Sequence, residues 1–333
     1  MLRMTRALPL LCTAVMALSV FAVWGAPEPT YPCLRVDSAP VVDGAVMGDP
    51  AWAAVPGVTG FYALGGGYTL AKQSTAYACH DAETLYLAVI CEEPDIARVK
   101  SVMKDGDGLW SEDSVELFIE PARGGPVYQL VVSAGGAKTG AAAAADTEGW
   151  RSAAQRGDRE YSIEVALPLA VFREQPNEGG WHIAFCRNIW TTDSGGDKFT
   201  SWPGLTSRFL EPEHYARLQF RDALASPELR DAAERALNAG YRAELVAQVR
   251  ALAPAAAQYL DVLKQAADDD TIPLQREARQ SLLTWSRVGR LAGDASDAPM
   301  QQLREAAARS TSLRQESYEL KYRYLLEKLL QGP

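Results

Sequence analysis

The sequence has little histidine and cysteine, with three and five residues respectively in a chain of 333. It contains no CxxC pair and no Cys/His spacing typical of a zinc site, and no Ser-His-Asp order is readable. Basic residues are also in deficit, with 33 Lys and Arg against 42 Asp and Glu, which gives a net charge of −9. An acidic surface repels phosphate backbones, and no basic patch interleaved with aromatics occurs, so we do not expect nucleic acid as a partner.

One long apolar run lies at the N-terminus. Arg3 and Arg6 precede "ALPLLCTAVMALSVFAVWGA", which ends in small residues where a signal peptidase would cleave. The pattern predicts a signal peptide over residues 1–25, with cleavage after Gly25 or Ala26 and a secreted or periplasmic protein. An uncleaved membrane anchor is the alternative, because the run is nearly long enough to span a bilayer.

Four cysteines remain after the leader, at Cys33, Cys79, Cys91 and Cys186. An even count in an exported chain allows disulfides, with three connectivities. Three of the four lie within strand-like runs, where a free thiol acts as a small buried apolar group. Both alternatives stay open.

The composition changes near residue 221. Before it, short alternating runs are separated by Gly, Pro and Asp turns, and "STAYACHDAETLYLAVICEEP" reads as a hairpin around a turn at 80–84. Further strands are expected at 114–120, 127–133, 161–167, 182–190 and 216–220, and "GGAKTGAAAAADTEG" is expected to be a surface loop. The pattern predicts an antiparallel β-sandwich over residues 33–221.

Residues 226–331 have helical periodicity instead. Ser226-Pro227-Glu228 is a helix start, and we expect that helical stretch to end at Pro254, with further helices at 255–267, 273–291 and 299–331. The last carries Tyr318, Tyr322, Leu325 and Leu329 at spacings of four, three and four. The region reads as a helical hairpin or bundle. It is either an appendage packed on itself or on the sandwich, or a coiled coil that binds a protein partner or forms oligomers.

The stretch "GLWSEDSVELFIEP" (108–121) sets a Trp and acidic residues before a core strand. Alternation places Glu116 on the face opposite Val115 and Leu117. In the following strand Gln129 shares one face with Val131 and Ser133. Glu116 and Gln129 are therefore expected to converge on one surface.

Six segments resemble the carbohydrate-binding module family 9-like domains, a jelly-roll or DOMON-like β-sandwich family of secreted bacterial proteins. They are "VVDGAVMGDPAW", "AYACHDAETLYLAVICEEP", "LWSEDSVELFIEP", "YSIEVALPL", "WHIAFCRNIW" and "TSWPGLTSRFLEPEHYARLQF", in this order. The resemblance covers about residues 33–220 and leaves out the helical region. It implies a non-catalytic protein of carbohydrate catabolism.

The resemblance also implies a site in which two aromatic side chains clamp a sugar ring and polar side chains bond its hydroxyls. Trp110 falls on the first clamp position, Phe209 on the second, Glu116 on a polar contact and Gln129 on the strand that carries others. The chain departs from the family pattern at Val131 and Ser133, where glycan-binding members carry Arg and Asn. These departures remove strong hydrogen-bond donors from the expected site.

Other functions remain as alternatives. Calcium could be bound by the acidic loop residues Asp105, Asp107, Glu112 and Asp113. Haem could be held by Met103 with a His or Lys. A hydrolase would use Glu112 or Asp113 paired with Glu116. A sugar-inert scaffold would act through its C-terminal helices.

Two further assignments are structural. Arg187 is expected to pair with a buried acid such as Glu164 or to bond backbone carbonyls. Five tryptophans are expected to pack in the core or at its rim, namely Trp52, Trp150, Trp181, Trp190 and Trp202.

Overall fold

The computed structural model describes residues 28–106, 108–142, 149–177, 179–192 and 198–331. The expected signal peptide lies outside these residues. Among the helices described, none is both long enough and apolar enough to cross a membrane.

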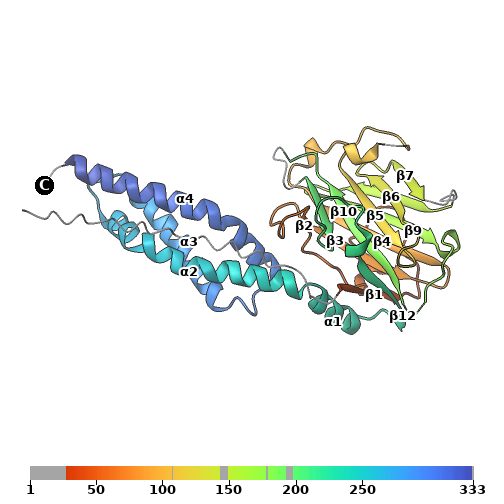
Figure 1. The fold of residues 1–333 in the computed structure, drawn as a ribbon. Helices are drawn as coiled ribbons and strands as arrows, with labels where there is room; N and C mark the ends of the chain where they lie inside the picture. Colours follow the sequence, from red (N-terminus) through yellow and green to blue (C-terminus); the bar gives the residue numbers. More distant parts are fainter. Residues whose placement is uncertain (1–27, 107, 143–148, 178, 193–197, 332–333) are drawn as a thin grey trace, which may run out of the picture.

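A mainly β unit is followed by four helices, and this confirms the predicted fold class (Figure 1). The strands are β1 Thr30–Arg35, β2 Tyr62–Ala63, β3 Ser74–His80, β4 Thr84–Glu92, β5 Ser114–Glu120, β6 Tyr128–Ser133, β7 Lys138–Ala142, β8 Arg151–Arg156, β9 Glu160–Pro168, β10 Trp181–Asn188, β11 Phe199–Trp202 and β12 Ala216–Leu224.

The strands form one sheet that folds over on itself. Its order is β7-β6-β5-β10-β12-β1-β3-β4-β9-β8, and outside this order β11 pairs with β10 and β2 pairs with β11. Leu117 of β5 and Leu87 of β4, from opposite halves, lie in the same hydrophobic core. The neighbouring pairs are antiparallel except that β1 runs parallel to both β12 and β3.

Both outer faces of the folded sheet carry covering segments. The loop before β2 packs Trp52 and Val55 over β3, β4 and β9. The segment between β11 and β12 packs Leu205 and Tyr215 over Phe118 of β5. For this reason every residue of β5 and of β10 is buried, although only one face of each strand lines the main core.

The predicted hairpin and strands appear in the structure, but one loop prediction is wrong. Residues 138–142 of the Gly/Ala-rich stretch form β7, which pairs with β6. Alanine and glycine have low strand propensity, so the pairing with β6 determines this strand. Residues 143–148 lie outside the part of the chain that is described.

The helices are α1 Pro227–Leu237, α2 Ala239–Asp268, α3 Gln275–Gly293 and α4 Met300–Gln331. Ser226 caps α1 by accepting a hydrogen bond from the Leu229 amide, as its sequence predicts. The expected end at Pro254 is wrong, because α2 continues through it. Burial of Leu252 and Ala256 against α3 and α4 on either side of the proline compensates for the lost backbone hydrogen bond.

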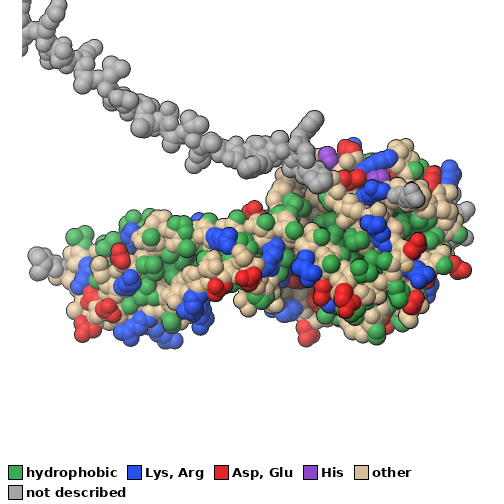
Figure 2. All heavy atoms as spheres, turned by 90° about the horizontal axis from the view of Figure 1, so that it is seen from below, with side chains coloured by type: hydrophobic (Ala, Val, Ile, Leu, Met, Phe, Trp, Pro, Cys, Tyr) green, Lys and Arg blue, Asp and Glu red, His purple; other side chains and the backbone are tan. Residues whose placement is uncertain are grey.

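Helices α2, α3 and α4 pack side by side as an elongated bundle that projects from the sandwich (Figures 1 and 2). Asn238 joins the two parts, since its side chain accepts from the Thr59 amide at 2.8 Å and donates to the Gly57 carbonyl at 2.9 Å. Arg304 at the start of α4 binds Glu92 at 2.6 Å. The start of α4 is therefore held at the sandwich, and its C-terminal end lies at the far end of the bundle.

Candidate functional site

The buried carboxylate of Glu116 lies at the centre of the predicted site. Its neighbours in the sheet are Val131 on β6 and Cys186 on β10, so all three share the face that turns away from the main core. Only 4% of Glu116 is exposed. A carboxylate removed from water to this extent needs polar partners.

Two side-chain amides supply these partners. Gln129 donates from Nε2 to Glu116 Oε2 at 2.6 Å, and Asn188 donates from Nδ2 to Glu116 Oε1 at 2.8 Å. The structure thus brings Glu116 and Gln129 together, as their alternation predicts. Burial raises the pKa of Glu116, and the hydrogen bonds from Asn188 and Gln129 offset part of this rise.

Asn188 is a residue of the site that the sequence interpretation missed. It lies 72 positions from Glu116 and reaches it only because β10 pairs with β5. Its Nδ2 also lies 3.0 Å from Ser114 Oγ. The available signal was alternation along "FCRN", which puts Cys186 and Asn188 on the same face.

Trp110 stands at the mouth of β5, in a short turn whose preceding residue, Gly108, has a φ of +93°. Leu109 is fully buried and anchors the turn, while 48% of Trp110 is exposed. A large aromatic side chain therefore lies open to solvent beside the strand that carries Glu116, and its role as a stacking surface stays a prediction.

Trp190 is the second exposed indole of this region, at 37%. Its Nε1 donates to the Trp110 carbonyl oxygen at 2.9 Å, so the two turns are tied together. The ammonium groups of Lys100 and Lys198 lie 5.6 and 5.1 Å from the centre of its ring. The other four tryptophans that we expected to be packed are buried.

Phe209 is half-buried and belongs to a row of aromatic rings. It contacts Phe118 at 6.4 Å and Phe199 at 6.1 Å, and Phe199 in turn contacts Trp190 at 6.4 Å between ring centres. The row links Phe209 to the turn of Trp110. The backbone around Phe209 is held by the carboxylate of Glu211, which accepts from the amides of Thr206, Ser207 and Arg208.

Val131 and Ser133 lie on the same face as Glu116 and are buried, at 1% and 0% exposure. Two amide side chains, Gln129 and Asn188, therefore surround the carboxylate where the family pattern would place an Arg and an Asn on the strand after it. The face retains polar donors, but it has no guanidinium next to Glu116 among its described contacts.

The acidic loop residues that suggested calcium bind backbone amides. Glu112 accepts from the amides of Val102 and Met103. Asp113 accepts from the amides of Lys100 at 2.8 Å and Trp190 at 2.9 Å. Within the described ranges no group of three or more His, Cys, Asp or Glu has the geometry of a metal site, and Asp107 lies outside them.

The residues that suggested haem or disulfides have other surroundings in the structure. The sulfur of Met103 accepts from Ser111 at 3.7 Å. Both ring nitrogens of His80 lie within hydrogen-bond distance of backbone carbonyls, those of Asp81 and Arg221. Cys33, Cys79, Cys91 and Cys186 are free and buried, which for Cys79, Cys91 and Cys186 is the alternative of small buried apolar groups.

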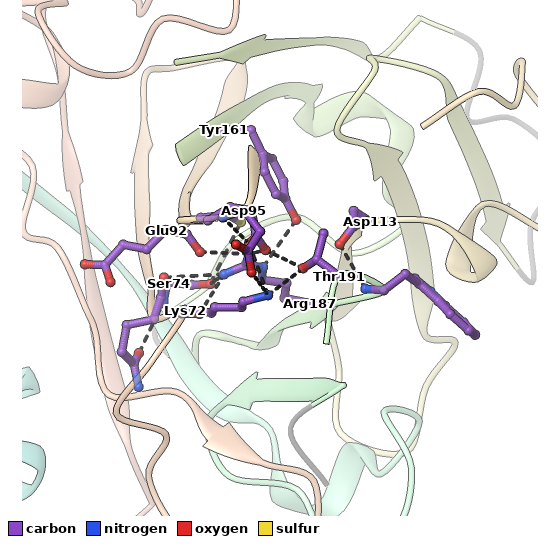
Figure 3. A network of polar contacts seen from close by, with 12 residues as sticks. Lys72, Ser74, Glu92, Asp95, Asp113, Tyr161, Arg187 and Thr191 are labelled. Carbon is purple, nitrogen blue, oxygen red and sulfur yellow. Dashed lines mark hydrogen bonds and ion pairs between the residues drawn. The ribbon is translucent and has the colours of Figure 1, made fainter. Parts of the chain in front are cut away.

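Arg187, next to Asn188, points to the opposite side of β10 and is fully buried (Figure 3). Its guanidinium donates to the carbonyls of Lys72 at 2.7 Å and Glu92 at 2.9 Å and lies 3.4 Å from the carboxylate of Glu93. The suggestion of Glu164 as its partner is wrong. Glu164 accepts from the Trp52 indole at 2.6 Å and from the Gly44 amide at 2.7 Å instead.

A family model and several solved structures match part of the chain. The model of the family described as carbohydrate family 9 binding domain-like matches residues 42–223. A carbohydrate binding module family 9 from Caldicellulosiruptor kristjanssonii in complex with cellotriose has 16% identity and a TM-score of 0.43, covering 59% of this chain and 94% of that one. A putative carbohydrate-binding protein from Bacteroides uniformis has 14% identity and a TM-score of 0.45, covering 58% and 100%. No curated protein matches the chain.

Proposed function

The chain belongs to the carbohydrate family 9 binding domain-like family, and from this premise we propose that it is an exported, non-catalytic protein that binds a sugar or the end of a polysaccharide. The observation that carries the proposal is that an exposed Trp110 lies in the turn just before the strand that holds the buried carboxylate of Glu116, which accepts hydrogen bonds from two side-chain amides. The leader sequence supports export.

The chemistry of a sugar matches this arrangement. The C–H face of a pyranose ring packs on an indole, and its hydroxyls need fixed donors and acceptors. Each oxygen of Glu116 accepts one amide hydrogen and keeps a further lone pair for a hydroxyl. Gln129 and Asn188 each keep an amide oxygen, so the three side chains offer acceptors as well as donors.

A non-catalytic role is part of the proposal. A glycosidase needs two carboxyl groups that flank one bond. The acids suggested as partners of Glu116 are Glu112 and Asp113, and both are occupied by backbone amides that hold the turn. The carboxylates therefore support the shape of the Trp110 turn.

Replacing Trp110 by alanine is expected to weaken sugar binding by roughly 10- to 100-fold, about 1.4–2.8 kcal/mol, because the stacking surface is lost. The measurement is calorimetric titration of the purified chain with a panel of mono- and oligosaccharides, with and without calcium. Leu283→Ala is the matched control, since Leu283 is similarly exposed, at 56%, but lies on α3. A folded protein that gives no heat with any glycan would overturn the proposal.

The affinity for sugar is also expected to depend on pH through Glu116. Because burial raises its pKa, the carboxylate should protonate above its ordinary value of 4.5 and lose acceptor capacity as the pH falls through that raised pKa. A group with a raised pKa contributes more to folding stability when protonated, so its contribution to the free energy of unfolding rises over the same range. As the pH falls, the affinity for sugar therefore decreases while the contribution of Glu116 to the free energy of unfolding increases.

Calorimetric titrations between about pH 4 and 8, with urea unfolding at each pH, separate binding from folding. Glu116→Gln should bind weakly at neutral pH and lack the acid-dependent loss. An unchanged pH profile in this variant would assign the titration to another group.

A further inference from the structure

The C-terminal part of α4 carries an apolar stripe that faces solvent. It consists of Tyr318, Tyr322, Leu325 and Leu329, whose exposed fractions are 49%, 50%, 42% and 76%. Leu326 and Leu330 beside them are also exposed, at 55% and 72%. The interpretation of this region as an appendage packed on itself or on the sandwich does not account for these side chains, because they face solvent.

The stripe lies opposite the side of α4 that builds the bundle. The buried residues of this part of α4 include Leu313, Ser317, Leu320 and Tyr324. At 100° per residue the centre of the buried set and the centre of the exposed set lie on opposite sides of the helix. The helix thus has two apolar seams, and α2 and α3 cover one of them.

We propose that the exposed seam of α4 pairs with the same seam of a second copy of this chain, as a parallel two-stranded coiled coil. The spacing of four, three and four is the a and d pattern of such a seam, with Tyr322 and Leu329 at a positions and Tyr318 and Leu325 at d positions. The rings of Tyr318 and Tyr322 already lie 4.5 Å apart, so the surface is continuous.

The size of the stripe fits an interface. Together with Leu326 and Leu330, the stripe presents six exposed side chains, which at roughly 100 Å² each make a strip on the order of 600 Å², the upper end of what monomeric surfaces carry. A specific interface buries about 800 Å² on each partner, and the flanking residues of a coiled coil supply the remainder. The stripe is short for an isolated coiled coil, but α4 is already ordered by α2 and α3, so pairing does not require helix formation.

The charges beside the stripe favour the parallel direction. Arg314 and Lys321 flank one side, at g positions, and Glu319 flanks the other, at an e position. Lys328, at the next g position, binds Asp269 of its own chain at 2.7 Å. In a parallel pair Arg314 faces Glu319 of the partner subunit, and the contact occurs twice. An antiparallel pair would instead place the basic rows of the two helices against each other.

A parallel dimer would present both sandwiches at one end. The start of α4 is held at the sandwich by Arg304 and Glu92, and the stripe lies at the distal end of the bundle (Figure 1). Two sugar sites on one side of a dimer would increase the avidity for a polysaccharide that displays many ends. The dimer itself does not depend on the proposed sugar binding, whereas this consequence does.

Sedimentation equilibrium of the purified chain over micromolar concentrations tests the pairing, with a dimer as the expected result. Leu325→Glu should raise the dimer dissociation constant by at least about 100-fold, because it places a charge in the seam. Leu283→Glu is the matched control, since Leu283 is an exposed leucine on α3, at 56%, and should leave the dimer intact. A chain that stays monomeric at about 100 μM would overturn the inference.

Two further variants test the direction. Arg314→Glu should weaken the dimer several-fold, and adding Glu319→Arg should restore it, because the pair is then reversed rather than removed. Gln315→Cys lies at the next a position toward the start of α4, and in a parallel dimer the two new thiols meet and cross-link on mild oxidation. A dimer that resists this cross-link would contradict the parallel arrangement. A monomer whose stripe binds phosphatidylglycerol vesicles would show that lipid, and not a second copy, covers it.

Discussion

Replacing Arg187 by methionine is expected to lower the free energy of unfolding by about 3–5 kcal/mol, measured by urea denaturation at neutral pH. Methionine fills a similar volume, so the loss of stability reports the missing polar contacts rather than a new cavity. Arg187 and Glu93 are both fully buried, and the variant would leave the Glu93 carboxylate with Lys72, at 3.1 Å, as its remaining cation. It would also free the carbonyls of Lys72 and Glu92, which accept from Arg187.

The surroundings of Arg187 stabilise its charged form. Burial acts to lower its pKa, but the neighbouring Tyr161, Cys91 and Glu93 outweigh this effect and raise it. Tyr161 contributes in two ways, because its hydroxyl accepts from Nε at 3.2 Å and its ring lies 5.2 Å from the guanidinium. A buried cation with all these partners joins β10 to the ends of β3 and β4 (Figure 3).

Two variants check that the loss arises from burial. Arg309→Met removes an arginine that is 55% exposed and paired with Glu316 at 3.2 Å, and it should cost less than about 0.5 kcal/mol. Combining Arg187→Met with Glu93→Met should recover part of the loss, because it removes both charges rather than one. A loss below about 1 kcal/mol in the single variant would mean that water reaches the cluster.

Local periodicity predicted the central strands well. The hairpin of β3 and β4 and the bounds of β5 follow from alternation and from turn residues between the runs. β7 could not be predicted in this way, because "KTGAA" has no strand pattern and depends on β6. Pro254 misled the helix prediction for the same reason, since packing on both sides of the proline outweighs its local effect.

The sequence predicted the contacts of the site that join consecutive strands, but not those that join strands far apart in the chain. Glu116 and Gln129 meet because β5 and β6 are consecutive and antiparallel, so alternation alone relates their faces. Asn188 and Trp190 come from β10 and the turn after it, and their contacts with the site depend on a pairing that the sequence does not encode locally. Arg187 pairs with Glu93 rather than Glu164 for a similar reason, because the folded sheet brings the end of β4 next to Arg187 on β10.

Replacing Glu211 by glutamine is expected to lower the free energy of unfolding by about 3 kcal/mol at neutral pH. Burial alone would raise the pKa of Glu211, but hydrogen bonds from Ser207 and Thr206 outweigh this and lower it from 4.5 to about 2. A lowered pKa means that this stability is fully present above pH 4.5 and is lost as the pH falls toward 2. Urea unfolding across this range should show that the variant lacks this acid-dependent loss.

Glu213→Gln is the matched control, because Glu213 is exposed and lies two residues away, so its effect should stay within about 0.5 kcal/mol. The loop that Glu211 holds also carries Phe209, whose carbonyl accepts from the Tyr215 hydroxyl at 2.9 Å. If Phe209 contributes the second aromatic surface for a sugar, Glu211→Gln should weaken sugar binding even where the protein remains folded. Lost stability with unchanged affinity would remove Phe209 from the site and leave Trp110 and Glu116 to bind the sugar.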